Sequence, residues 1–172
     1  MKKKIVIVSI LLLVLILILF VYCYCNLKSN SVYYAKNTPH KEGTEPVLMM
    51  LVDNLFWIYN PEIEGIKYDF DGGQAIYNYN FKDEDVPVFV SYGGGRKYSY
   101  CNNGFKTYKF DYHFNLTSSR DVREGKIDIK DIDVEEVKKE IYEIVQPVID
   151  AQTKPLINLQ WLFDRVYRDK FN

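Results

Sequence analysis

The chain has 172 residues, of which 48% are hydrophobic, 16% aromatic and 26% charged, and its formal net charge is -1. This near-neutral charge argues against nucleic acid as a partner, and the high aromatic content argues against a disordered chain. Three cysteines, two of them inside an apolar block, are too few for a disulfide framework. The composition therefore indicates one small globular domain joined to a hydrophobic segment.

Residues 5–25 form an almost uninterrupted apolar run, in which Ser9 is the only conventionally polar residue. At roughly 1.5 Å rise per residue, a helix of this length spans about 30 Å, the thickness of the hydrocarbon core of a bilayer. Three lysines at residues 2–4 precede the run, so the positive-inside rule places the N-terminus in the cytoplasm. We expect a single-pass cell-membrane protein, with residues 1–25 as cytoplasmic end and anchor and the remainder extracellular.

A cleaved signal peptide is the main alternative to this anchor. Its apolar region usually has about 7–15 residues and is followed by small residues at a cleavage site. The run here is longer, and residues 22–30 contain no A-x-A-like sequence. A lipoprotein is disfavoured because tyrosines 22 and 24, rather than small residues, precede Cys23 and Cys25. An uncleaved anchor is therefore the favoured interpretation.

Residues 26–45 are rich in Asn, Ser, Thr and Lys and lack hydrophobic periodicity, which predicts a tether that lifts the domain off the bilayer. Within this tether, Tyr33 and Tyr34 are compatible with a short docking strand. Residues 46–172 are expected to form the extracytoplasmic domain. Its first segment, residues 47–60, has apolar residues at helical spacing, so we favour a helix, with a strand as the alternative. The exported part keeps 19 of the 22 basic residues and all 23 acidic ones, a net charge of -4.

Between Ile66 and Leu116 the apolar residues alternate with polar ones, which is the pattern of half-buried strands. Turn-forming residues interrupt the pattern at positions 71–73, 82–85, 93–95 and 102–104. The last alternating segment, from Thr107 to Leu116, is the most regular. Short turns between such strands predict an antiparallel meander of about five strands, with one face packed and the other in water.

Two amphipathic helices are expected after the sheet. Asp133 has the position of an N-cap, with Glu136 three residues later, and apolar residues then recur at helical spacing. Pro147 should kink or end this helix, and a second apolar stripe follows Pro155. Both stripes need an apolar surface to cover, and the aromatic face of the sheet is available. The predicted fold class is therefore α+β, with helices on one face of the meander.

Motifs for chemistry are missing from the sequence. The chain has two histidines, His40 and His113, without a cysteine pair nearby, which disfavours a zinc site. The acidic residues at 69–71 lack the spacing of a calcium loop, and those at 83–85 are most simply a solvated turn. No nucleophile elbow or phosphate-binding loop is present. We therefore predict no enzyme activity, no cofactor, no metal and no small-molecule substrate. A hydrolase is the remaining alternative, if Asp53, Asp111 and His113 converge.

The second face of the predicted sheet is the candidate binding surface. A solvated sheet face is the simplest explanation of its polar residues, but a broad polar surface edged by tyrosines also suits protein recognition. The partner-binding candidates that we select on this face are Asn78, Asn80, Ser99, Lys109, Asp111, His113 and Asn115.

The arrangement of anchor, short linker, tyrosine-rich meander and C-terminal helices resembles that of the TipC-type immunity proteins of Gram-positive bacteria. The segments that carry the resemblance are YDFDGGQAIYNYNF, VPVFVSYGGGRKYSY and LQWLFDRVYRDKFN. The resemblance implies a membrane-bound protector that faces outward and neutralises a secreted LXG-type toxin acting on lipid-linked cell-wall precursor. It transfers no specific contact residues. The alternative is a non-catalytic subunit of a cell-envelope assembly, such as a secretion or conjugation apparatus.

Overall fold

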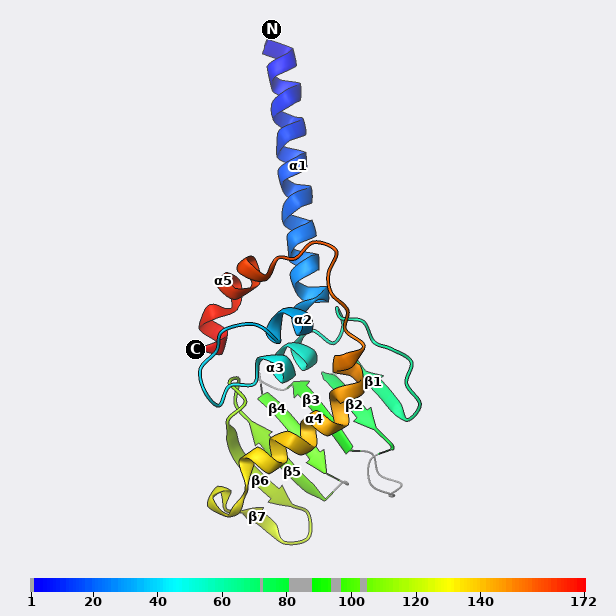
Figure 1. Ribbon diagram of the computed structural model, residues 1–172, viewed down its shortest axis with the longest axis vertical. Helices are drawn as coiled ribbons and strands as arrows, with labels where there is room; N and C mark the ends of the chain where they lie inside the picture. Colours follow the sequence, from blue (N-terminus) through cyan, green and yellow to red (C-terminus); the bar gives the residue numbers. More distant parts are fainter. Residues whose placement is uncertain (1, 72, 81–87, 94–96, 103–104) are drawn as a thin grey trace.

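The computed structural model describes the chain except residues 1, 72, 81–87, 94–96 and 103–104. A long N-terminal helix projects from an α+β domain, which confirms the predicted fold class (Figure 1). In chain order, the helices are α1 (Lys2–Ser29), α2 (Ser31–Ala35), α3 (Pro46–Asp53), the short 3-10 helix η1 (Ile129–Asp131), α4 (Val134–Asp150) and α5 (Gln160–Phe171).

The sheet is an antiparallel meander in which each strand pairs with the next one in sequence. It has seven strands, not five: β1 (Ile66–Asp69), β2 (Gln74–Asn78), β3 (Val88–Gly93), β4 (Lys97–Asn102), β5 (Lys106–Phe110), β6 (Leu116–Asp121) and β7 (Gly125–Ile127). The two additional strands follow the segment in which we expected the sheet to end. The turns predicted at 71–73, 82–85, 93–95 and 102–104 lie wholly or partly outside the described residues.

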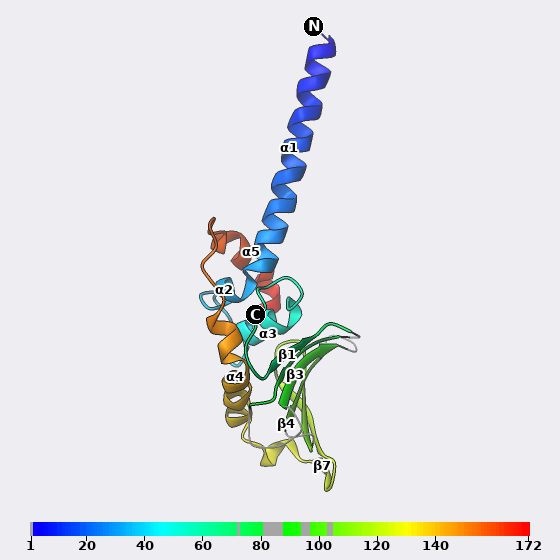
Figure 2. The same cartoon turned by 90° about the vertical axis from the view of Figure 1, so that its right-hand side faces the viewer.

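Helix α4 packs along one face of the sheet, with α3 at its upper end (Figure 2). The Glu140 carboxylate of α4 accepts hydrogen bonds from the Tyr100 hydroxyl at 2.9 Å and the Asn102 amide at 3.0 Å. Burial, followed by this hydrogen bond to Glu140, raises the pKa of Tyr100 above its ordinary value. From α3, Asp53 accepts a hydrogen bond from the Tyr98 hydroxyl at 2.9 Å. Polar contacts therefore fix both helices on the aromatic face of β4.

Helix α5 does not share this face, although we expected both C-terminal helices to cover it. It lies beside the base of α1 and packs against α2, where the Phe163 and Tyr34 rings are 5.3 Å apart (Figures 1 and 2). The side chains of Phe163 and Phe171 are fully buried in the same core that α3, α4 and the sheet enclose. The C-terminal helix thus closes the end of the domain from which α1 emerges.

Residues 26–36 belong to the folded domain instead of forming a free tether. Helix α1 continues without a break from the apolar run to Ser29, and α2 follows almost directly. Leu27 is 7% exposed, and Val32 and Tyr34 are fully buried. Tyr34 lies in a helix, not in a docking strand, and its hydroxyl donates a hydrogen bond to the Asn26 side chain at 2.6 Å. The C-terminal end of α1 therefore enters the hydrophobic core directly.

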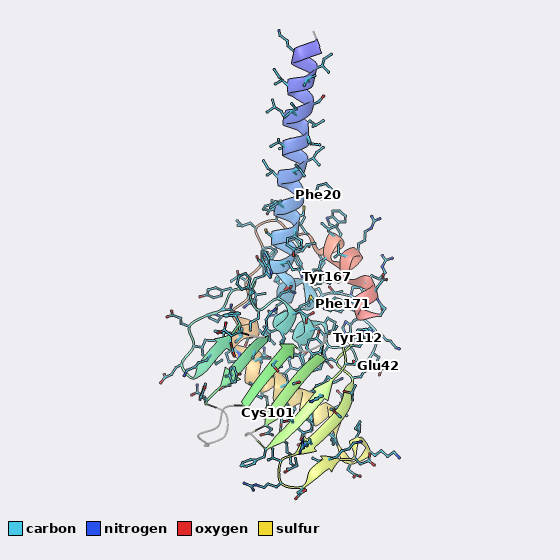
Figure 3. All side chains as sticks on the ribbon, turned by 180° about the vertical axis from the view of Figure 1, so that it is seen from behind. Phe20, Glu42, Cys101, Tyr112, Tyr167 and Phe171 are labelled. Atoms are coloured by element: carbon cyan, nitrogen blue, oxygen red, sulfur yellow. The ribbon has the colours of Figure 1, made fainter. Side chains whose placement is uncertain are left out.

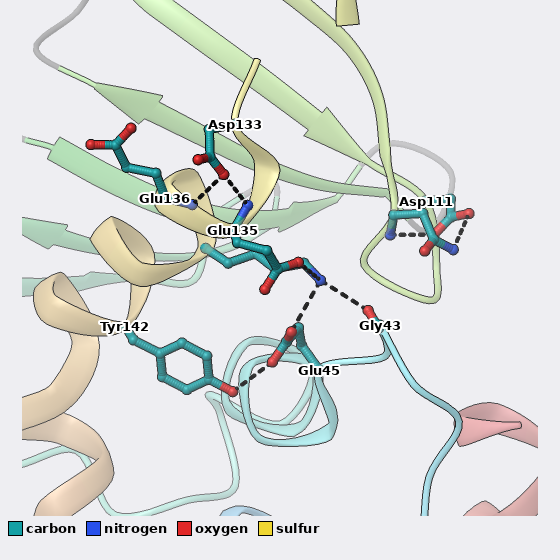
Figure 4. Close-up of polar contacts among 9 residues, drawn as sticks. Gly43, Glu45, Asp111, Asp133, Glu135, Glu136 and Tyr142 are labelled. Carbon is teal, nitrogen blue, oxygen red and sulfur yellow. Dashed lines mark hydrogen bonds and ion pairs between the residues drawn. The ribbon is translucent and has the colours of Figure 1, made fainter. Parts of the chain in front are cut away.

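The N-terminus of α4 is capped as its sequence predicts. The Asp133 carboxylate accepts hydrogen bonds from the backbone N–H groups of Glu135 and Glu136, each at 3.1 Å (Figure 4). Helix α4 continues through Pro147 as far as Asp150. Near its start, Lys138 is buried and forms an ion pair with Glu45 at 3.1 Å, so α4 is also fastened to the segment before α3.

The segment from Thr107 to Leu116 is a hairpin and not one continuous strand. Strand β5 ends at Phe110, and β6 begins at Leu116. Phe114, between them, has a φ of 69°, which an extended strand does not allow. This conformation turns the Phe114 ring into the core, where it stacks on Phe110 with ring centres 4.7 Å apart. The apparent alternation in sequence therefore conceals a tight turn.

Candidate partner-binding surface

The face of the sheet opposite α4 is not covered by any described element (Figure 3). Alternate residues of β4 to β7 lie on this open face, and the pairing arranges them in two rows. One row runs from Ser99 through Lys109 to Ser118. The other consists of Cys101, Thr107, Arg120 and Lys126, each paired with the next. Cys101 is a buried free thiol on this face.

The part of the open face formed by β5, β6 and β7 is hollowed, with a volume of about 790 Å³. We call this hollow with its rim the basic hollow, because three of its side chains are cationic and exposed: Lys109, Arg120 and Lys126. The remaining lining residues are Thr107, Ser118, Ser119, Val122 and Gly125. The hollow therefore combines a mostly apolar lining with hydroxyl groups and a local positive charge.

The positive charges in the basic hollow repel one another. Arg120 on β6 is the direct cross-strand partner of Lys126 on β7, and like charges in such a position destabilise a sheet. Among the described residues, the ion pairs of the chain involve Lys138, Lys139 and Lys170, and none reaches the hollow. An anionic group in the hollow would compensate this repulsion. The hollow thus fits a negatively charged partner.

The structure separates the seven partner-binding candidates selected from the sequence. Ser99 and Lys109 lie on the open face as direct cross-strand neighbours. Asn78 lies on the opposite face, is buried, and donates a hydrogen bond to the Ile144 carbonyl of α4 at 3.0 Å. Asn80 follows the end of β2, where its backbone N–H donates to the Asn78 side chain at 2.9 Å. Asn78 is therefore a structural link between sheet and helix.

The other three candidates, Asp111, His113 and Asn115, lie in the β5–β6 turn. The Asp111 carboxylate accepts hydrogen bonds from the backbone N–H groups of His113 and Asn115, both at 2.9 Å. Partial burial favours the neutral acid, but the hydrogen bonds from Asn115 and His113 outweigh it and lower the pKa of Asp111. His113 Nδ1 contacts the Lys170 carbonyl of α5 at 3.1 Å. These side chains shape the turn and its contact with α5.

The residues of the hydrolase alternative are engaged in separate interactions. Asp53 forms an ion pair with the Lys170 ammonium and accepts the bond from Tyr98, whereas His113 contacts the backbone carbonyl of Lys170. The Asp111 carboxylate is occupied by the amides of its own turn. Within the part of the chain that the structure describes, no three His, Cys, Asp or Glu side chains gather as a metal site.

Sequence reasoning missed Arg120 and Lys126, which carry most of the charge of the basic hollow. Both follow the point at which we expected the sheet to end, because β6 and β7 lack alternating apolar residues. In β6 the residues on the inner face are Ser119 and Asp121, which are buried although polar. The tight Asp121–Gly125 turn, with Gly125 at a φ of 88°, was the available signal for another hairpin.

Comparisons with known proteins leave the chain without an assigned family. No protein-family model, curated protein or solved structure matches it. Among the described residues, α1 is the one helix that is long and apolar enough to cross a membrane. The chain is therefore an α+β protein with a candidate N-terminal membrane span and a basic hollow on the open face of its sheet.

Proposed function

We propose that the protein is a membrane-anchored binding protein that displays its sheet outside the cytoplasm and neutralises a secreted protein toxin. The observation that carries the proposal is the basic hollow on an uncovered sheet face. Its facing cations, Arg120 and Lys126, lack a described acidic partner, and an acidic surface of a bound protein would supply one.

The charge pattern of α1 supports the direction of display. Lysines precede its apolar run, so the positive-inside rule retains them in the cytoplasm and exports the domain. The resemblance to TipC-type immunity proteins adds the identity of the partner, an LXG-type toxin that acts on cell-wall precursor. Occlusion of such a toxin needs a large interface, of about 1,600 Å² in a typical stable complex. The open face offers several strands for this contact.

The test is protection of cells that are exposed to a candidate LXG-type toxin. Cells that express the chain should survive, and the toxin should co-purify with it from detergent extracts. Reversing the charge of the hollow, with Lys109→Glu, Arg120→Glu and Lys126→Glu together, should abolish both results while expression persists.

A charge reversal outside the hollow is the matched control. Lys139→Glu changes an exposed residue of α4, on the other side of the sheet, and should leave protection intact. Unchanged killing by every candidate toxin, without a complex, would contradict the proposed role. Protection by the triple variant at the level of the unmodified chain would exclude the basic hollow as the contact.

A further inference from the structure

Exposed apolar side chains gather at the end of the domain from which α1 emerges. We call this group, composed of Phe56, Trp57, Leu156, Ile157 and Trp161, the apolar collar. Leu156 is fully exposed, Phe56 is 70% exposed and Trp161 is 64% exposed. Single exposed apolar residues are ordinary in folded proteins, but a group of five large ones indicates a surface that is covered by something else.

The apolar collar lies around the base of α1. Trp57 and Ile157 contact that helix, and Trp161 belongs to α5, which lies beside it (Figures 1 and 2). The Trp57 ring meets the Tyr24 ring edge-on, with centres 5.7 Å apart, and Phe56 in turn contacts Trp57. On another element, the Ile157 carbonyl accepts a hydrogen bond from the Asn26 side chain at 3.2 Å. The connection between α4 and α5, which carries Leu156 and Ile157, lies beside α1 in both views (Figures 1 and 2).

The exposed part of α1 is only long enough to cross one bilayer, so a membrane crossed by it would lie directly against the domain. The helix is exposed from Ile5 to Tyr22, and Asn26 and Leu27 are already buried in the domain. At 1.5 Å per residue, the exposed part is about 27 Å long, close to the thickness of one hydrocarbon core. With this part of α1 across the bilayer, the residues at its base stand at the level of the lipid headgroups. The apolar collar stands at the same level.

We propose that the apolar collar is embedded in the outer leaflet of the bilayer that α1 crosses, so that the domain is seated on the membrane at two or more points. This inference rests on the membrane anchoring in the proposed function. Tryptophan is enriched at the membrane interface, and apolar side chains of peripheral elements sink about 5–10 Å into the boundary between headgroups and acyl chains. Such seating fixes the tilt of the sheet and leaves the β7 end farthest from the lipid.

Tryptophan fluorescence tests this seating without an added label. The chain has two tryptophans, and both belong to the apolar collar. The full-length protein is reconstituted in phosphatidylcholine vesicles whose acyl chains carry bromine, a quencher, either near the headgroup or deep in the bilayer. Trp57→Phe and Trp161→Phe each leave one emitter. Both emitters should lose intensity with the shallow quencher, lose less with the deep one, and resist quenching by iodide in the water.

A tryptophan moved along the chain supplies the matched controls. With Trp57 and Trp161 both replaced by Phe, Leu156→Trp should be quenched by the shallow bromine at least as strongly as the native tryptophans. Val122→Trp lies at an exposed position just before β7, at the opposite end of the domain from α1. That emitter should respond to iodide and not to brominated lipid.

Extraction with alkaline carbonate separates the two possible failures. A protein that stays in the membrane but has iodide-accessible, unquenched tryptophans at 57, 161 and 156 would overturn the seating and leave the anchor intact. A protein released by carbonate would contradict the anchoring itself and the seating with it.

Discussion

The two ends of the domain are held together by different kinds of contact. At the end near α1, residues from the beginning of the chain bond to residues from its end: Asn26 with Ile157, Thr38 with Asp164, and Lys41 with Phe171. At the β7 end, contacts join successive strands and turns of the meander, which are much closer together in the sequence. The Val122 backbone N–H donates to the Phe105 carbonyl at 2.9 Å, and the Arg123 guanidinium lies 4.0 Å from the Phe105 ring centre.

This difference suggests that the α1 end determines the stability of the domain and that the β7 end carries the proposed binding surface. Contacts between distant parts of a chain order the most residues, so losing one at the α1 end affects the whole domain. Because the side chains on the open face of the β7 end are largely exposed, we expect the hairpins there to tolerate changes in the basic hollow. In the proposed arrangement, the end near α1 is a rigid base that faces the membrane, and the basic hollow lies on the part of the domain farthest from it.

The largest loss of stability is expected from a substitution at the α1 end. Phe163→Ala should destabilise the domain by about 3–5 kcal/mol, since a buried ring that contacts Tyr34 and Tyr167 is removed and leaves a cavity. Denaturant unfolding in detergent micelles measures the loss. Val122→Ala, at an exposed site of the β7 end, is the control and should change little. Equal losses of stability from the two substitutions would contradict the claim that the α1 end contributes more to stability than the β7 end.

A smaller loss is expected from the polar contacts at the same end. Asp53→Asn removes the charge that binds the Lys170 ammonium and weakens the acceptor for the Tyr98 hydroxyl. We expect a loss of about 1.5–3 kcal/mol, the range for hydrogen bonds to charged groups. The same unfolding experiment measures it, with Asp69→Asn on β1 as the control. An unchanged midpoint would show that the contacts of Asp53 with Lys170 and Tyr98 add nothing measurable to stability.

The N-cap of α4 should contribute less to stability than the contacts of Asp53. Asp133→Ala leaves two backbone N–H groups without their acceptor and should cost about 1 kcal/mol. Asp133→Asn keeps a capping oxygen and should recover most of the loss in the same measurement. A variant Asp133→Asn as unstable as Asp133→Ala would attribute the effect to charge instead of capping.

The smallest effect is a pH dependence at the β5–β6 turn. Because the folded state lowers the pKa of Asp111, its carboxylate stabilises the fold above the ordinary aspartate pKa of about 3.9. That contribution is lost as the pH falls through the lowered folded pKa. Unfolding midpoints from neutral to acid pH should therefore fall less steeply for Asp111→Asn than for the unmodified chain. Parallel curves would contradict the assignment.

The sequence predicts best where apolar periodicity governs the structure. The apolar run of α1, the alternation in β1 and β4 and the capping pattern before α4 all have local causes, and the structure confirms them. The strand count was too low because Ser119 and Asp121 occupy inner positions of β6, where apolar residues are usual. Asn78 was assigned to the wrong face because its inner position depends on an acceptor from α4, a tertiary contact.

Two further differences also have tertiary causes. Residues 26–36 have the composition of a loop, but the buried Tyr34 side chain finds partners on α1 and on the α4–α5 connection, which orders them. On the open face of the sheet, Ser99 and Lys109 followed from alternation, whereas Arg120 and Lys126 depend on a hairpin whose strands have little apolar character. Sequence patterns therefore identified two of these four residues of the open face.

Labelling of single cysteines in intact cells tests most directly whether α1 crosses the membrane with the folded domain on its outer side. A membrane-impermeant thiol reagent is applied to Lys126→Cys, at the β7 end, and to Lys4→Cys, at the start of α1, with the native cysteines replaced by serine. The proposed arrangement predicts labelling of Lys126→Cys in intact cells and of Lys4→Cys only after the membrane is opened. Labelling in the reverse order would contradict it.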